Sequence, residues 1–257
     1  MFMYLSHPLD PKDLAWPGEP VVEVTRCTDV GEETPFSSFI TKLPNHCGTH
    51  MDAPRHFVKD GLSINELPIE YFCHKEVALI EIPKGEAEGI TKEDLLPYVD
   101  ILSKVSFAFL RTGFEKYRTE NPAIYQNECP YISTGAGQYL SDTFPNLKGV
   151  GIDFLALGSP SSRVPDAENP KNCHRAILGY YTGRFTTVIE DMHLAELPKN
   201  CHRAILGYYT GRFTTVIEDM HLAELPKNAN IKQFFNAPWR IKGLDSSQVT
   251  CIVELQQ

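Results

Sequence analysis

What the sequence lacks already excludes several classes of protein. Its seven cysteines include no C-x-x-C pair, so we expect neither a thiolate zinc knuckle nor a disulfide framework. There is no run rich in Lys and Arg, and the net charge is -9, which disfavours nucleic acid and anionic membrane surfaces as partners. Apolar runs such as 105–110 are far too short to span a bilayer, and residues 1–8 do not resemble a secretory signal. We therefore expect a cytoplasmic protein with reduced cysteines.

The chain contains an internal repeat. Residues 171–198 recur without a change as residues 199–226. Solenoids need three or more imperfect units, so two identical copies indicate a recent or engineered duplication instead. A close-packed interior has no room for a second full element in the same place, so only one copy can fill a given slot. With 42% hydrophobic and 22% charged residues, the sequence predicts a single globular domain over 1–257 that contains this duplication.

Hydrophobic patterning predicts a mixed α/β fold. Runs rich in β-branched residues predict strands at 21–25, 77–82, 105–110, 150–154, 186–189 with its copy at 214–217, and 249–253. A capping box at Thr91 predicts one short helix, and Ser133 or Thr134 caps another. A third helix is predicted at 174–178. Strands interspersed with short helices favour a mixed sheet over a regular βαβ repeat.

One short segment gathers the side chains of a metal site. Within eleven positions lie His46, His50, Asp52 and His56. Imidazole nitrogen and carboxylate oxygen suit zinc, manganese or iron, and three ligands leave positions open for water and substrate. A lone histidine is usually structural, but three so close together make that interpretation much weaker. Because Gly48 and Pro54 disfavour a helix, we expect the cluster on a turn and an irregular loop.

The chemistry expected of such a site is hydrolysis. A bound metal lowers the pKa of its water toward about 7 and polarises a carbonyl. His56 lies beyond the tight group and can exchange a proton near neutral pH, so it is the candidate general base and acid. A fourth ligand or an orienting group is the alternative for His56.

The segment from His46 to Phe57, H-C-G-T-H-M-D-A-P-R-H-F, resembles a known signature. It matches H-x-G-T-H-x-D-x-P-x-H-F of the cyclase family of metal-dependent hydrolases, which includes bacterial kynurenine formamidases and isatin hydrolases. Weaker matches lie at 5–8, 16–18, 110–113 and 151–153. The resemblance implies the family's swivelling β/β/α fold, a mixed sheet with short helices. It also implies assembly as a homodimer or homotetramer.

The resemblance further implies one or two divalent ions per chain, zinc or manganese, and a catalytic role for His56. The implied first-site ligands are His46, His50 and Asp52, with Asp52 bridging to a second metal. The implied second-site ligands are His174 and Glu190, or their copies His202 and Glu218. A mixed pair of His174 and Glu218 is also possible, although 158–172 leads directly into His174 and favours the first copy. The doubled unit and the long stretch between its His and Glu depart from the family pattern.

The resemblance implies an enzyme that cleaves a carbon-nitrogen amide bond in a small aryl formamide or cyclic amide. A lactone hydrolase or dehydratase of the same fold is one alternative, because the motif fixes the metal and not the substrate. A non-catalytic metal-binding protein, its site disturbed by the duplication, is another. Three further side chains have structural explanations. Arg111 is expected to be solvated or ion-paired, with substrate binding the less favoured alternative, and His193 and His221 are expected to follow a strand.

Overall fold

The computed structural model describes residues 2–11, 15–178, 215–217, 219–226, 229–241 and 243–256. Three predicted second-site ligands, Glu190, His202 and Glu218, lie outside the described residues.

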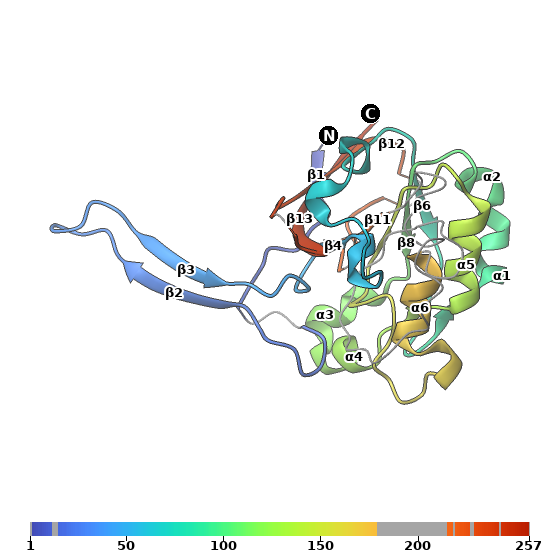
Figure 1. The fold of residues 1–257 in the computed structure, drawn as a ribbon, viewed down its shortest axis with the longest axis horizontal. Coiled ribbons are helices and arrows are strands. Elements are labelled where there is room, and N and C mark those ends of the chain that lie inside the picture. Colours follow the sequence, from blue (N-terminus) through green and yellow to red (C-terminus); the bar gives the residue numbers. More distant parts are fainter. Residues whose placement is uncertain are drawn as a thin grey trace.

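The chain alternates strands with short helices in this part (Figure 1). The strands are β1 (Phe2–Tyr4), β2 (Glu23–Thr28), β3 (Ser38–Lys42), β4 (His50–Asp52), β5 (Cys73–His74), β6 (Val77–Glu81), β7 (Gly89–Ile90), β8 (Phe107–Arg111), β9 (Tyr131–Ile132), β10 (Gly149–Ile152), β11 (Thr215–Ile217), β12 (Ile231–Pro238) and β13 (Ser246–Leu255). The α-helices are α1 (Lys92–Leu95), α2 (Val99–Leu102), α3 (Tyr117–Glu120), α4 (Pro122–Asn127), α5 (Thr134–Thr143) and α6 (Pro170–Ile177). The 3₁₀ turns are η1 (Pro54–His56), η2 (Ile64–Glu66), η3 (Ile69–Tyr71), η4 (Leu96–Tyr98), η5 (Phe114–Lys116) and η6 (Asp166–Glu168).

A mixed sheet organises the described residues. Its strand order is β5-β12-β13-β4-β11-β10-β8-β6, with β1 paired to β13. The strands β6, β8, β10 and β11 run parallel, and β4 joins antiparallel to β11 on one side and to β13 on the other. Every residue of β8 is buried, as expected for a strand covered on both faces. The helices α1, α2, α5 and α6 lie on one side of this sheet (Figure 1). The predicted mixed α/β class is therefore confirmed.

Two of the predicted helix starts agree with the structure, whereas the helix predicted at 174–178 is α6, which begins earlier, at Pro170. Thr91 and Asp94 form the capping box that opens α1. Ser133 caps α5 by accepting a hydrogen bond from the amide of Ala136. In α6, Pro170 occupies the first turn, where its missing N–H costs nothing. Among the described residues, no helix has both the length and the apolar character that crossing a membrane requires.

The hairpin formed by β2 and β3 projects far from the sheet (Figure 1). It corrects the strand predicted at 21–25, which begins at Glu23 and continues to Thr28. Phe39 and Ile40 are 52% and 61% exposed on it, as neighbours in β3 whose side chains point to opposite faces of the strand. The homodimer or homotetramer stays a prediction, which sedimentation equilibrium would test.

The two copies of the repeat contribute differently to the described structure. The first copy supplies α6, which contains His174. The second supplies β11, in the slot between β10 and β4. The sheet is therefore completed by a strand whose sequence also occurs at 187–189.

Deleting one copy is expected to leave the fold and its stability nearly unchanged. Removal of either 171–198 or 199–226 gives the same sequence, which still encodes one such helix and one such strand. Because the closure entropy of a connection varies slowly with its length, we expect the free energy of unfolding to change by about 1 kcal/mol. Urea unfolding of the two proteins measures this. A loss above about 3 kcal/mol, the size of a core defect, would mean that both copies pack into the interior.

Candidate metal centre

The predicted metal cluster lies in the middle of the sheet. His50 and Asp52 belong to β4, whose neighbours are β11 and β13, so the prediction of an irregular loop is wrong for these two residues. This strand was not predicted because it has only three residues and lies between Gly48 and Pro54, which indicated a loop. Gly48, just before it, has a φ of 62°, so the predicted tight turn at this glycine is present.

The structure brings three predicted ligands together. One ligand atom each from His46, His50 and Asp52 lies within 4.8 Å of the others. The Nδ1 atom of His46 is 3.3 Å from Oδ1 of Asp52. His50 and Asp52 are buried, so neither can rely on solvent to stabilise a charge. Their role as ligands stays a prediction, which the following details support.

The hydrogen bonding of His50 fits a metal ligand. Its Nδ1 atom lies 2.8 Å from the carbonyl of Gly48, to which it donates as an N–H. The other ring nitrogen, Nε2, then carries a lone pair, and it is buried without a hydrogen-bond partner among the described residues. Burial lowers the pKa of His50 to about 3, so the ring is neutral, as metal binding requires. Two imidazoles and one carboxylate thus suit a divalent transition metal.

The ring of His46 is protonated in the metal-free protein, so it carries positive charge at the candidate metal site. Burial alone would lower its pKa, but the charge of Asp52 and the hydrogen bonds to Asp245 and Asp52 raise the pKa to about 9. In the absence of metal, an imidazolium at His46 therefore neutralises the buried carboxylate of Asp52.

This proton predicts how the stability of the metal-free protein depends on pH. A pKa above the unfolded value of about 6.5 stabilises the fold fully below that pH, and the contribution is lost as pH rises through about 9. We expect the metal-free protein to lose on the order of 2 kcal/mol between about pH 7 and pH 10. Urea unfolding with and without a chelator measures this. A bound metal replaces the proton, so the loaded protein should show no such loss, and parallel curves would contradict the assignment.

His56 is oriented by a carboxylate that the sequence interpretation missed. The Nδ1 atom of His56 lies 3.0 Å from Oδ2 of Asp245, so an N–H there donates to the carboxylate. This leaves Nε2 of His56 directed toward Asp52, 3.6 Å from Oδ2. Burial, aided by the neighbouring charge of His46, holds the pKa of His56 well below 6.5. The ring is then neutral at physiological pH, with a lone pair facing the candidate metal site.

Asp245 takes its place through long-range strand pairing. It immediately precedes β13, whose first residue Ser246 pairs with Asp52. Its Oδ1 accepts a hydrogen bond of 2.8 Å from Asn45, and its Oδ2 is shared between His56 and His46, the latter at 3.3 Å. No local motif marks this residue, because its position depends on the register between β13 and β4.

His174 lies beside the cluster. Its ring stacks on Phe57 at a centroid distance of 4.6 Å, and it is 6.1 Å from the ring of His56. The proposed partner Glu190 and the copies His202 and Glu218 lie outside the described residues, so the second site stays a prediction. Arg111 forms the expected ion pair, since its guanidinium bonds to Glu81 and to the carbonyls of Leu222 and Leu225.

Comparisons with known proteins identify the family and the fold of the chain. A family model described as "Putative cyclase" matches residues 3–159. A protein of Haemophilus influenzae, described only as uncharacterized, is 81% identical over 129 residues, which are 50% of this chain and 91% of that protein. Isatin hydrolase A from Labrenzia aggregata, bound to benzyl benzoate, superposes with a TM-score of 0.68 at 18% identity, covering 98% of this chain and 93% of that chain. A predicted metal-dependent hydrolase from Bacillus stearothermophilus gives a TM-score of 0.60 at 19% identity, covering 98% and 97%.

At these identities the solved structures bear on the fold alone, and they confirm the predicted one. The family match covers the His46 to Phe57 signature together with most of the parallel strands. The chain therefore belongs to the cyclase family.

Proposed function

We propose that this protein is a metal-dependent hydrolase that cleaves the carbon-nitrogen amide bond of a small aryl formamide or cyclic amide. The observation that carries the proposal is the convergence of His46, His50 and Asp52 beside a neutral His56. One structural neighbour is named as an isatin hydrolase, and isatin is a cyclic amide. This likeness supports a cyclic amide as one substrate class.

The proposed roles follow from the donor sets. His46, His50 and Asp52 would hold one zinc or manganese ion. His174, with Glu190 or the copy Glu218, would hold a second. When bound, the metal supplies an activated water at neutral pH and polarises the amide carbonyl. Asp52 is buried in β4, so the strand fixes the carboxylate before any ligand arrives.

His56 would move the proton. With Nδ1–H held by Asp245, its Nε2 accepts a proton from the attacking water and then delivers it to the leaving nitrogen. Asp245 acts through His56, because it fixes the tautomer and stabilises the imidazolium that forms. The pair thus supplies both the base and the acid that amide hydrolysis needs.

A substrate panel tests this function. We expect metal-loaded protein to hydrolyse an aryl formamide or the cyclic amide isatin, and to lose at least about 100-fold in rate after chelation, with recovery on adding zinc or manganese. Turnover of lactones alone would point to the alternative chemistry of the same fold. Full metal occupancy without turnover of any panel member would indicate a metal-binding protein and contradict the proposal.

A further inference from the structure

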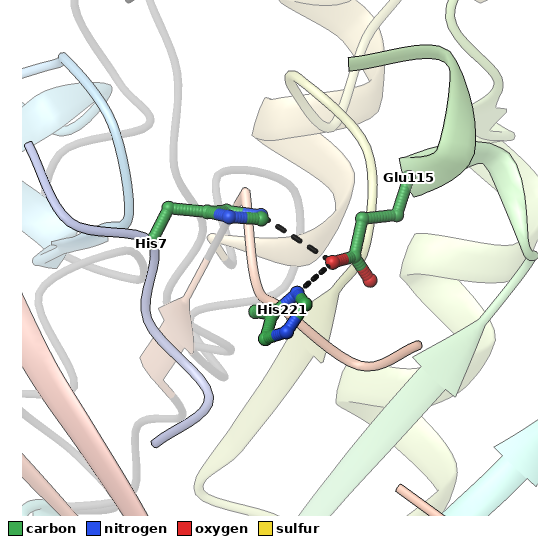
Figure 2. A group of neighbouring side chains, drawn as sticks. All are labelled: His7, Glu115 and His221. Carbon is green, nitrogen blue, oxygen red and sulfur yellow. Dashed lines mark hydrogen bonds and ion pairs between the residues drawn. The ribbon is translucent and has the colours of Figure 1, made fainter. Parts of the chain in front are cut away.

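A second cluster of metal-ligating side chains lies apart from the candidate centre. We propose that His7, Glu115 and His221 form a site for a divalent transition metal of the zinc class. One ligand atom from each lies within 4.8 Å of the others, and the group shares no residue with the two groups around His46. Figure 2 shows both imidazoles directed at the carboxylate of Glu115. Two histidines and a glutamate form a donor set that zinc uses in proteins, with a position left for water.

The carboxylate of Glu115 is fixed for this role. Its Oε2 accepts hydrogen bonds of 2.7 Å and 2.8 Å from the backbone amides of Leu222 and Ala223. Its Oε1 is the atom that faces the two histidines, 3.6 Å from Nε2 of His7 and hydrogen-bonded to Nδ1 of His221. One oxygen therefore anchors the side chain, and the other is presented to the site.

His221 has the outer partner that metal-binding histidines commonly have. Its Nε2 lies 3.4 Å from a carboxylate oxygen of Glu224, which can accept the N–H. Burial lowers the pKa of His221, but its hydrogen bonds to Glu115 and Glu224 raise the pKa overall, so in the metal-free chain Nδ1 donates to Oε1 of Glu115. A metal at Nδ1 would take the place of that proton. A carboxylate behind the ring fixes its orientation and increases its basicity as a ligand.

The third donor, His7, reaches the site from the N-terminal segment. Its Nε2 atom is buried and has no hydrogen-bond partner in the part of the chain that the structure describes. Its backbone amide donates to Oγ1 of Thr49 at 3.0 Å, which fixes this segment against the sheet. Burial lowers the pKa of His7, which favours the neutral ring that a metal binds.

The charges around the cluster favour a cation. Glu115 and Asp219 are both buried, and Oδ1 of Asp219 lies 3.9 Å from Nε2 of His7. Asp219 is neutralised by Arg118, at 3.2 Å. Among the described residues, the ion pairs of Glu115 are made with His7 and His221, which are charged only when protonated. A divalent ion would neutralise the remaining carboxylate without requiring a proton on either ring.

The site is accessible from a cavity and separate from the first centre. Both histidines line a cavity of about 760 Å³, so water or a small ligand can reach the open coordination position. Oγ1 of Thr49 donates to the carbonyl of Asp219 at 2.5 Å, on the side of His7, whereas the next residue, His50, belongs to the first centre. The two centres therefore share no ligand, although Thr49 and His50 are neighbours in the chain.

Cobalt binding tests the site without reference to catalysis. In a chain carrying His46→Ala, His50→Ala and His174→Ala, which lacks ligands of both metals of the proposed function, we expect one Co²⁺ per chain, with the visible absorption of a low-coordinate ion that Zn²⁺ displaces. Adding His221→Ala should weaken binding more than about 10-fold, and Glu224→Gln, which changes a 67% exposed side chain, should weaken it by a smaller factor. Should this triple variant fail to fold, the same measurement on the full chain should show one ion fewer after His221→Ala than before.

His193 provides the matched control, because it has identical sequence neighbours in the other copy of the repeat. His193→Ala should leave Co²⁺ affinity unchanged. The assignment is overturned if the chain lacking His46, His50 and His174 binds no Co²⁺, or if His7→Ala and His221→Ala both retain full affinity. Loss of the ion with His193→Ala in place of His221→Ala would also overturn it.

Discussion

The variant His56→Ala is expected to keep its metal and to lose about 10² to 10⁴ in kcat. The Nε2 atom of His56 lies 3.6 Å from Oδ2 of Asp52. The ligand atoms of His46, His50 and Asp52 nevertheless lie close together without a contribution from His56. Removing the imidazole therefore removes the proton acceptor and leaves the ligand set intact. Steady-state kinetics on the best panel substrate, together with elemental analysis of the same preparation, measures both quantities.

His74 is the matched control for this loss. It is buried, and its ring is hydrogen-bonded to Ser106 and to the carbonyl of Tyr71, remote from the cluster. His74→Ala should lower the thermal midpoint and leave kcat per folded molecule unchanged. Wild-type turnover in His56→Ala would remove His56 from the chemistry, and loss of metal in that variant would identify it as a ligand.

The second large effect is expected from the ligands themselves. His50→Ala and Asp52→Asn should each lower metal content from full occupancy to a small fraction and abolish turnover with it. The Nε2 atom of His50 provides a lone pair that has no hydrogen-bond partner among the described residues. Asp52 provides the buried negative charge. Elemental analysis after dialysis against a weak chelator measures the loss.

Asp153 is the control for Asp52. It is another buried aspartate, but it accepts hydrogen bonds from the amides of Thr112 and Gly113 and from the hydroxyl of Thr112. Asp153→Asn should reduce stability, since it replaces an acceptor by a donor, and should keep the metal. Equal metal loss in both aspartate variants would mean that general destabilisation, and not ligand removal, explains the effect.

Local sequence patterns predicted the elements that depend on local physics. The apolar run at 105–110 became β8, and the capping residues Thr91 and Ser133 begin α1 and α5. These features depend on the spacing of apolar residues and on hydrogen bonds within one helical turn, and both can be recognised in a few consecutive residues. The spacing of His46, His50 and Asp52 was informative for the same reason.

Features set by pairing between distant segments were not predictable in this way. Asp245 meets His56 only because β13 pairs with β4, and His7 meets His221 only because the N-terminal segment lies beside the end of β11. The repeat posed the same problem, since identical copies carry identical local signals. Only the completed sheet distinguishes them, by placing β11 of the second copy beside β4.

An anomalous difference map of zinc-loaded crystals tests the central claim most directly. A peak is expected about 2.0–2.2 Å from a nitrogen of His46, a nitrogen of His50 and an oxygen of Asp52. A map with no peak there, or with density only between His7 and His221, would contradict a catalytic metal held by β4.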